Sequence, residues 1–503
     1  MHVVPPAGAC IGLTREEFEA AVDHARDVIS SDVLFPPTTR PTVLQMSVAV
    51  QDAFATLAIP DEGQPLSELV EFAREHVLSH PRGNLSPRFF GWVLSPPAHA
   101  GIVGELLAAA FNASCGGQGH AAILLESTVV RWLMELMEFP REGSHGILTS
   151  GGSAATLYAL ACARNRAAQS LGLDVRSLGL QGLGRRLVFY QSEATHVCVR
   201  RAVEVLGLGH NALRTIPVDA RGELKVGLLR DAIRRDRDDG LLPSCVVATA
   251  GTVDTGAIDP LTAIAALCEA ERLWLHIDGA YGAPAILDPR KRDRLCGMAM
   301  ADSLSVDPHK WLYVPIECGC LLVRREEDLR DTFRVQSSYL NPSSDMPPAP
   351  MDYGVQFTRA FRALKLWMTL ARAGRNGIAR AIQKCNSLAA DLAAKVADSG
   401  ELELVAPTAL SIVCFRYRGR GALADHALDA INESIVAELQ REGIVFPTRT
   451  VVDAKVCIRA IILHYDTGSS DLDLLLERVV ASGRRLAGAL PAACATVEGH
   501  VGS

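Results

Sequence analysis

The sequence predicts an α/β protein with a mainly parallel central sheet, an N-terminal helical segment and a small C-terminal α+β domain. The first observation behind this prediction is that strand-like apolar runs alternate with helical periodicity between residues 186 and 277. Parallel neighbours need long crossover connections, usually helices, so this alternation indicates a parallel sheet covered by helices. The second observation is a change of pattern after residue 375. We therefore expect three regions, at 1–79, 80–374 and 375–503, because 503 residues exceed one ordinary core.

The composition is that of an ordinary globular chain, with 49% hydrophobic and 21% charged residues. A net charge of −7 without a basic stripe argues against a nucleic-acid partner. The thirteen cysteines are scattered, and Cys318 and Cys320 would point to opposite faces of a strand, so we expect no metal site and reduced thiols. The chain has no signal-like N-terminus and no run of about 18 apolar residues, so we expect no membrane partner and a cytoplasmic location.

The N-terminal region is expected to become helical after residues 1–13. Thr14 followed by Glu17 predicts a capping box, and apolar residues then recur at helical spacing. Prolines at positions 36, 37 and 41 end this helix. A second amphipathic helix is predicted at 67–78.

A loop rich in proline and aromatic residues follows between positions 80 and 97. Its Ser-Pro-Arg-Phe-Phe-Gly-Trp run brings Phe89, Phe90 and Trp92 close together. Such aromatics either pack in the core or line a pocket, and the run by itself leaves both roles open. Helices are expected at 101–111 and 123–138.

A glycine-rich loop at 150–153 stands directly before a helix predicted at 157–166. Small residues at a helix N-terminus leave backbone N–H groups free to bind a phosphate, and Ser153 can add its hydroxyl. The loop has neither the GxGxxG nor the GxxxxGK[ST] spacing, so dinucleotide or ATP binding is disfavoured.

Three groups of polar residues follow predicted strands and would meet at the carboxyl edge of the sheet, where ligands bind. They are the Ser192–His196 run, Thr252 and Asp278. The predicted strands are 186–190, 213–217, 244–250 and 273–277, and the predicted helices between them are 197–206, 224–235 and 261–271.

Lys310 is the candidate nucleophile. An apolar/polar alternation through Leu304 and Val306 predicts a strand that ends at Pro308. Lys310 then follows the end of this strand and has apolar neighbours. Desolvation and a nearby positive group would lower its pKa from the ordinary value of about 10.4 and make it a Schiff-base nucleophile. Taken alone, a lysine is more often a solvated surface charge.

Asp278, 32 residues before Lys310, favours the nucleophile over a solvated surface lysine. This separation is long enough for a crossover to a neighbouring parallel strand. A carboxylate and a lysine at one sheet edge are the pair that holds pyridoxal phosphate, with the carboxylate on the pyridinium nitrogen and the lysine on the aldehyde.

The Ser303–Leu312 segment, with Asp-Pro-His-Lys-Trp inside it, resembles the lysine signature of the group II pyridoxal-phosphate-dependent amino-acid decarboxylases. This family includes the aromatic-L-amino-acid, histidine and glutamate decarboxylases, and recognisable motifs run from about residue 80 to about 370. The resemblance implies fold type I, as in aspartate aminotransferase, and a homodimer with its active site at or near the interface. It also implies that the N-terminal helices pack against the partner subunit.

The same resemblance implies roles for individual residues. Lys310 would hold the cofactor, Asp278 its ring nitrogen, and His196 one face of the ring, with Ala280 on the other face. Around the phosphate and ring, the implied cofactor-binding residues are Ser153, Ala154, His196, Thr252, Asp278, Ala280, His309 and Lys310. Phe89, Phe90 and Trp92 would line the substrate pocket, which favours an aromatic or bulky amino acid.

Residues 333–356 lack periodicity, which suggests a functional loop or disorder. The family carries a loop here whose tyrosine protonates the substrate carbon. Tyr353 is the better match and Tyr339 the competitor, so the implied catalytic residues are Lys310, His196, Tyr353 and Asp278. The next segment, 358–367, resembles a family helix.

Two departures from the family pattern bear on substrate choice. Ser86 replaces a histidine before the aromatic run, and Glu126 alone is retained from the family's Ser-Pro-x-x-Thr-Glu-Leu-Glu run. The C-terminal region is expected to hold helices at 378–399, 424–442 and 470–486 and strands at 402–405, 411–417 and 456–463.

The resemblance predicts decarboxylation of an L-amino acid to an amine and CO2. Two alternatives remain. One is oxidative decarboxylation-deamination to an aldehyde, which the family shows when the loop tyrosine or the stacking histidine changes. The other is a cofactor-free scaffold that keeps the fold without activity.

Overall fold

The computed structural model describes residues 12–37, 40–117, 119–335, 349–421 and 423–489. Its larger sheet has seven strands in the order β2-β8-β7-β6-β5-β3-β4, and only β8 runs antiparallel to its neighbours. The mainly parallel sheet predicted from the sequence is therefore confirmed. The strands are β2 His145–Thr149, β3 Leu187–Ser192, β4 Leu213–Ile216, β5 Leu242–Thr249, β6 Trp274–Asp278, β7 Ser303–Val306 and β8 Gly319–Val323.

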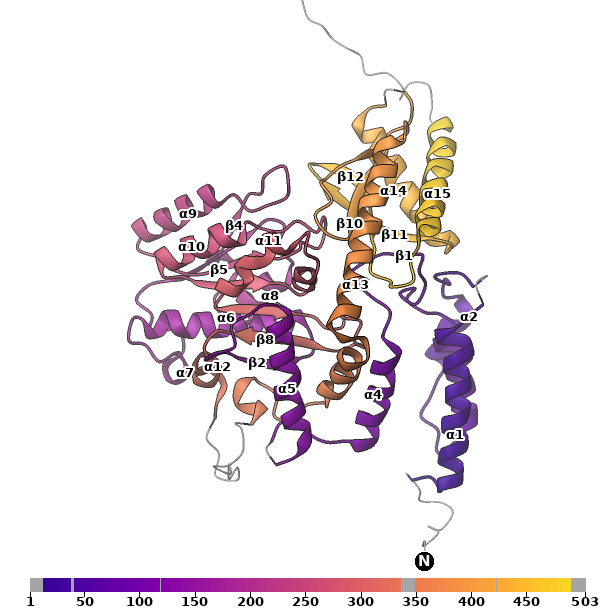
Figure 1. Cartoon of the computed structure of the whole chain (residues 1–503), viewed down its shortest axis with the longest axis horizontal. Helices are drawn as coiled ribbons and strands as arrows, with labels where there is room; N and C mark the ends of the chain where they lie inside the picture. The colour runs from indigo at the N-terminus through magenta and orange to yellow at the C-terminus, as the bar shows by residue number, and fades with distance from the viewer. Residues whose placement is uncertain (1–11, 38–39, 118, 336–348, 422, 490–503) are drawn as a thin grey trace, which may run out of the picture.

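Helices cover both faces of this sheet (Figure 1), and the inner strands β6, β7 and β8 are buried along their whole length. Alternate residues of β3, β5 and β8 enter two separate apolar clusters, one on each face. The covering helices are α5 Ala121–Leu136, α6 Gly152–Gln169, α8 Cys198–Val205, α9 Val226–Asp238, α10 Leu261–Glu271 and α12 Glu326–Phe333. Short helical elements are α7 Val175–Leu178, α11 Arg292–Leu295, η3 His210–Ala212, η4 Ala283–Leu287, η5 Cys296–Met300 and η6 Pro350–Tyr353.

The C-terminal part contains a second, five-stranded sheet in the order β1-β11-β12-β10-β9. The long element α13 (Arg362–Asp398) runs from the first sheet to the second (Figure 1), and its backbone breaks at Gly374, where φ is 65° and ψ is 164°. Glycine adopts this conformation without a Cβ clash. The other elements here are β9 Leu402–Leu404, β10 Ile412–Tyr417, β11 Phe446–Val452, β12 Lys455–Ile461, α14 Asp425–Glu442 and α15 Ser469–Gly488.

Strand β1 (Phe89–Phe90) belongs to this second sheet, because Phe89 pairs in parallel with Phe446 of β11. The sequence analysis placed 80–374 in one region and did not predict β11. One face of β11 is exposed and the strand contains Pro447, so it lacks the apolar run that marked the other strands.

The N-terminal helices form a column beside the rest of the molecule (Figure 1). The capping box of α1 (Arg15–Val28) is confirmed: Thr14 N donates to Glu17 Oε2 at 2.8 Å and Glu17 N to Thr14 Oγ1 at 3.2 Å. The helix predicted at 67–78 is also confirmed as α3 (Leu66–Phe72), which continues into the wider turns of η2. The remaining elements are η1 Ile29–Leu34, α2 Val48–Ala55, η2 Ala73–Leu78 and α4 His99–Phe111. Among the described residues, none of the helices is both long and apolar enough to cross a membrane.

Candidate active site

The carboxyl ends of three neighbouring parallel strands bring the main candidates together. In the strand register Asp278, the last residue of β6, pairs with Thr249 of β5 and with Ser305 of β7. Lys310 follows the end of β7 by four residues. Asp278 and Lys310 therefore lie at the same end of the sheet, where the parallel strands have their carboxyl ends. The crossover between adjacent parallel strands that their spacing predicted is present.

The ammonium of Lys310 lies 3.0 Å from Asp307 Oδ2. Burial lowers the pKa of Lys310, but the carboxylates of Asp307 and Asp278 raise it, and the net direction is upward. The lowered pKa of Lys310 that the sequence predicted is therefore wrong for this chain. Two carboxylates face the amine where a positive group was expected.

Asp278 is held by hydrogen bonds to one of its two oxygens. Oδ1 accepts from Ala280 N and from Ser305 Oγ, both at 3.1 Å. Within the described part of the chain, Oδ2 has no hydrogen-bond partner. An oriented carboxylate with one free oxygen suits a pyridinium N–H.

The glycine-rich loop connects β2 to α6 at the same edge. Neither Gly151 nor Gly152 brings a side chain, and a Cβ at Gly152 would lie 3.0 Å from Ala280 Cβ and 3.0 Å from Asp307 Oδ2. Ser153 is exposed at the start of α6, where first-turn N–H groups have no partner inside the helix. This helix start, the free Asp278 oxygen and the partly exposed Lys310 amine together fit pyridoxal phosphate.

Three further predicted residues lie in turns that follow strands. His196 is exposed before α8, and its Nδ1 accepts from Cys198 N at 3.3 Å. His309 is oriented by Cys318, whose carbonyl oxygen lies 2.7 Å from Nδ1, and burial lowers the pKa of His309. Thr252 is 1% exposed and its Oγ1 accepts from Ala257 N at 3.1 Å, so its hydroxyl organises the turn after β5.

The structure does not bring Tyr353 to this edge. Its ring stacks on His145 with centroids 3.9 Å apart, and its hydroxyl donates to Glu326 Oε1 at 2.6 Å. His145 begins β2 and pairs with Val323, which pairs with Ser303 at the start of β7, so this is the opposite edge of the sheet. Within one chain Tyr353 therefore does not reach Asp278 and Lys310, and its role as proton donor stays a prediction. The competitor Tyr339 lies outside the described residues.

The aromatic loop packs against the second sheet. Phe90 is fully buried, and Phe89 stacks on Phe446 with centroids 5.4 Å apart. The pocket-wall role expected for Phe89 and Phe90 is thus replaced by packing, since both side chains are covered. Trp92 keeps 38% of its surface exposed and carries the Arg82 guanidinium 4.0 Å from its ring centroid.

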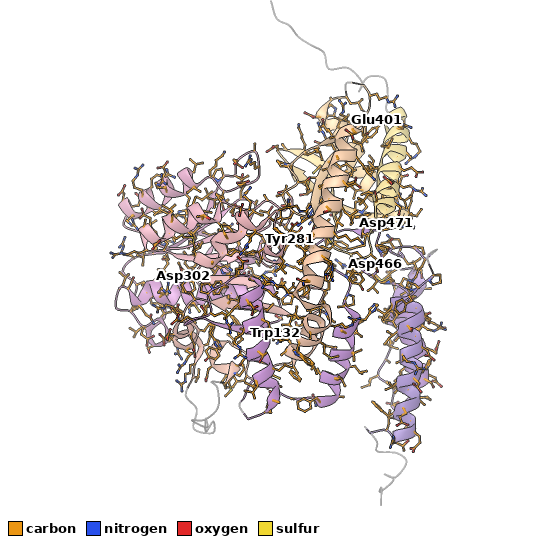
Figure 2. The ribbon with its side chains drawn as sticks, viewed as in Figure 1. Trp132, Tyr281, Asp302, Glu401, Asp466 and Asp471 are labelled. Carbon is orange, nitrogen blue, oxygen red and sulfur yellow. The ribbon has the colours of Figure 1, made fainter. Side chains whose placement is uncertain are left out.

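Trp311, the residue after Lys310, is clamped where the two sheets meet. It is fully buried and stacks on Tyr281, with ring centroids 5.0 Å apart and planes 11° apart. Tyr281 lies beside α13 (Figure 2), and its hydroxyl contacts Ser411 Oγ at 2.6 Å. This contact between the sheets fixes the segment that carries Lys310.

A buried ion pair that was not predicted from the sequence supports the glycine-rich loop. Arg359 Nη2 donates to Glu126 Oε1 at 2.7 Å and to Leu148 O at 2.6 Å, and Leu148 N donates to Glu126 Oε1 at 3.2 Å. The pair fixes α5 to β2 just before the loop. Its sequence signal was the retained Glu126, but nothing local connected it to an arginine 233 residues away.

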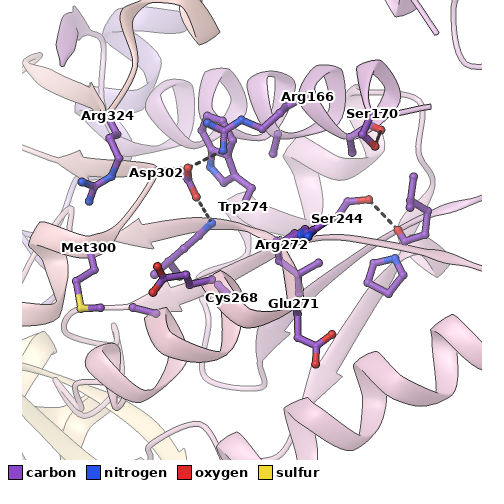
Figure 3. Close-up of a pocket in the computed structure, with 18 of the residues that line it drawn as sticks. Arg166, Ser170, Ser244, Cys268, Glu271, Arg272, Trp274, Met300, Asp302 and Arg324 are labelled. Carbon is purple, nitrogen blue, oxygen red and sulfur yellow. Dashed lines mark hydrogen bonds and ion pairs between the residues drawn. The ribbon is translucent and has the colours of Figure 1, made fainter. Parts of the chain in front are cut away.

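A cavity of about 940 Å³ lies at the other edge of the sheet, around the starts of β5 and β6 (Figure 3). Two of its arginines are paired with acidic residues: Arg166 with Asp302 at 2.6 Å, and Arg237 with Glu271. None of the predicted site residues lines it. This cavity is distinct from the candidate active site.

A mainly parallel sheet with a glycine-rich helix start, a strand-end aspartate and a lysine after the next strand is the arrangement expected of a pyridoxal-phosphate enzyme of fold type I. A family model described as the pyridoxal-dependent decarboxylase conserved domain matches residues 51–418. The chain therefore belongs to the pyridoxal-dependent decarboxylase family, and it is a pyridoxal-phosphate-dependent carboxy-lyase.

Similar proteins agree with this assignment. An aromatic-L-amino-acid decarboxylase from Bacillus atrophaeus is 33% identical, over 85% of this chain and 87% of that protein. An L-2,4-diaminobutyrate decarboxylase from Rhizobium meliloti is 34% identical, over 84% of this chain and 82% of that protein. The crystal structure of Oryza sativa TDC with PLP and tryptamine has a TM-score of 0.89 at 27% identity, covering 95% of this chain and 100% of that one.

Proposed function

We propose that this chain decarboxylates an aromatic L-amino acid to the amine and CO2 at the sheet edge that holds Asp278 and Lys310. The proposal rests on one observation: Asp278, Lys310 and the glycine-rich start of α6 all lie at the end of the sheet where the parallel strands have their carboxyl ends. Bound pyridoxal phosphate supplies an electron sink for the bond that breaks at the substrate Cα.

In this proposal each residue has a defined role. Asp278 Oδ2 would accept a hydrogen bond from the protonated ring nitrogen, and its negative charge would raise the pKa of that nitrogen and keep it protonated. The start of α6, with Ser153 and Ala154, binds the phosphate. His196 covers one ring face opposite Ala280 and, since Tyr353 lies elsewhere, is the described residue we assign to return the proton to Cα. Thr252 and His309 complete the surroundings of the cofactor.

The first test is the colour of the purified protein. Wild type should show an absorption band near about 420 nm, the region of a lysine-bound pyridoxal cofactor. Lys310→Ala should lack the band, whereas Lys225→Ala, at an exposed position, should keep it. An uncoloured wild type that does not take up added cofactor would favour the cofactor-free scaffold.

Substrate class is tested by CO2 release from a panel of amino acids. We expect tryptophan, tyrosine or phenylalanine to exceed 2,4-diaminobutyrate in kcat/KM by at least about tenfold, the discrimination available to an apolar pocket. Diaminobutyrate is the specific competitor, because the Rhizobium relative is as similar to this chain as the Bacillus one. A preference for diaminobutyrate or glutamate would overturn the aromatic assignment.

Aldehyde formation is a second candidate, because Tyr353 does not reach the site. In the family to which the motifs point, a change of the loop tyrosine accompanies that reaction. Amine, ammonia and peroxide should be measured together after a turnover with the preferred substrate. Equal amounts of amine and CO2 support simple decarboxylation, whereas stoichiometric ammonia and peroxide support the aldehyde reaction.

We also propose a homodimer with the active site at or near its interface. The N-terminal column and α4 expose large apolar side chains, which in soluble proteins usually mark a contact surface. On α4 these are Val103, Leu106, Leu107 and Phe111, each about half exposed. A cytoplasmic location is supported by the free thiols of all eleven described cysteines.

A further inference from the structure

A buried carboxylate lies beside the proposed phosphate site. Asp307 is 2% exposed, and its Oδ2 lies 3.0 Å from Lys310 Nζ. Its Oδ1 is buried and, within the described residues, has no hydrogen-bond partner. A buried carboxylate oxygen without a hydrogen-bond partner is costly, so its presence beside Lys310 points to a role for Asp307.

Asp307 faces the start of α6 directly. Its Oδ2 would lie 3.0 Å from a Cβ on Gly152, and its Oδ1 3.9 Å from one on Gly151. A phosphate bound by the first N–H groups of α6 would therefore come close to this carboxylate. Two anions in a partly buried site repel each other.

The other charges around Asp307 come from three elements. His309, on the same segment, has its Nε2 3.8 Å from Asp307 Oδ2, and its pKa is lowered by burial. The carboxylate of Asp278 in β6 raises the pKa of Lys310. The pKa of the Cys198 thiol in α8 is raised by Asp278 and Asp307 and lowered by Lys310, so this thiol also lies near the pair. Lys310 is thus the cation in direct contact with Asp307.

We propose that Asp307 is the counter-ion that stores Lys310 as an ammonium in the cofactor-free chain, and that this pair must separate before a phosphate-bearing aldehyde can bind covalently. Asp307 is then a positioning residue that sets the rate of cofactor uptake. This inference rests on the proposed role of Lys310.

The separation can occur by proton transfer within the pair. The ammonium proton passes to Asp307, which leaves a neutral amine and a neutral carboxylic acid. The amine nitrogen then bonds to the aldehyde carbon, and the aldehyde oxygen leaves as water with the two remaining amine hydrogens. The protonated Asp307 no longer repels the phosphate and can donate a hydrogen bond to it.

The test compares cofactor uptake by cofactor-free wild type, Asp307→Asn and Asp307→Glu. Growth of the absorption band is followed after mixing with pyridoxal 5'-phosphate, and in parallel with pyridoxal, which has no phosphate. We expect Asp307→Asn to accelerate uptake of the phosphorylated aldehyde by about tenfold and that of pyridoxal by less, since only the former meets anion repulsion. Asp307→Glu keeps the charge and should not accelerate uptake.

A second measurement needs no cofactor. Labelling of Lys310 by trinitrobenzenesulfonate, read by peptide mass, should reach its half-maximal rate at a lower pH in Asp307→Asn than in wild type, because the counter-ion is gone. If Asp307→Asn does not fold, Asp307→Ser takes its place in both measurements. Unchanged uptake and unchanged labelling would overturn the inference.

These outcomes are separable from failure of the proposed function. If Lys310 does not bind the cofactor, Lys310→Ala will form the same band as wild type, whatever stands at position 307. If only the inference fails, Lys310→Ala will be colourless while Asp307→Asn and wild type behave alike.

Discussion

The charges around Lys310 decide its chemistry more than its burial does. Burial alone would favour the neutral amine, but Asp307 and Asp278 favour the ammonium and the net shift of the Lys310 pKa is upward. Both aspartates are visible in the sequence. That both face the same amine depends on the turn after β7 and on the pairing of β6 with β7.

Tyr353 is the residue whose role changed most between sequence and structure. Tyr353→Phe should leave kcat within about twofold of wild type, because the hydroxyl lies at the opposite sheet edge. It should lower the free energy of unfolding by about 1 kcal/mol through loss of the bond to Glu326. Urea unfolding and steady-state kinetics on the same preparation check both values.

The opposite pattern would contradict this placement of Tyr353. A fall in kcat of more than about 100-fold with unchanged unfolding would be the size expected for a lost proton donor. Tyr339→Phe is the matched variant for the competitor.

His276 predicts a pH dependence of stability. Burial lowers its pKa from 6.5 to about 4, and its Nε2 is buried without a hydrogen-bond partner in the described part of the chain. Between these two pKa values the unfolded chain binds more protons than the folded one, so stability falls as the pH drops. Lowering the pH from 7 to 5 should cost about 2 kcal/mol through this group, at about 1.36 kcal/mol per pKa unit.

The measurement is the free energy of urea unfolding at both pH values for wild type and His276→Gln. Glutamine stays neutral at both, so the variant should lose less stability on acidification, even if it is less stable at pH 7. Equal losses in the two proteins would show that His276 does not titrate in this range.

At the scale of elements, the start of α6 is built for close approach. Gly152→Ala adds a Cβ that meets Ala280 Cβ and Asp307 Oδ2 at 3.0 Å, so the loop must shift. We expect cofactor affinity to fall by about tenfold, corresponding to about 1.4 kcal/mol, as measured by titration of the cofactor-free protein. Such a shift acts on phosphate binding and leaves the helix itself intact.

Gly377→Ala is the matched control for this change. Gly377 lies inside α13, where a Cβ would make an ordinary contact with Ala373 at 3.6 Å. The control should keep wild-type cofactor affinity and gain up to about 1 kcal/mol of stability from alanine's helix propensity. Equal affinities in the two variants would mean that Gly152 is not part of the phosphate site.

At the scale of the whole molecule, the exposed apolar surface of α4 is the basis for predicting a dimer. Leu106 and Phe111 are 56% and 58% exposed, and two charges placed there would have to be buried in an interface. Leu106→Asp/Phe111→Asp should therefore be monomeric by light scattering, with most activity lost if the site needs the partner. Leu178→Asp, on the short helix α7 and 62% exposed, should remain dimeric.

A monomeric wild type would remove the basis for this prediction. A double variant that stays dimeric would instead place the interface away from α4. Only in the first case would decarboxylation have to be explained within one chain.

Much of the fold could be predicted because its signals are local. The capping box at Thr14, the helical and strand periods between 186 and 277, and the glycine-rich loop before α6 each involve residues only a few positions apart. The Asp278 and Lys310 pair was also predictable, because a crossover connection between neighbouring parallel strands brings their carboxyl ends to the same end of the sheet.

Tertiary structure alone decided which distant groups meet. It placed Tyr353 on His145, paired Phe89 with Phe446, joined Arg359 to Glu126 and set Asp307 against Lys310 beside Gly152. These contacts depend on strand order and on the paths of loops, which no local period encodes. Sequence by itself therefore determined most of the elements, the cofactor and the family, whereas the direction of the Lys310 pKa shift and the position of Tyr353 within the chain follow from packing across the whole chain.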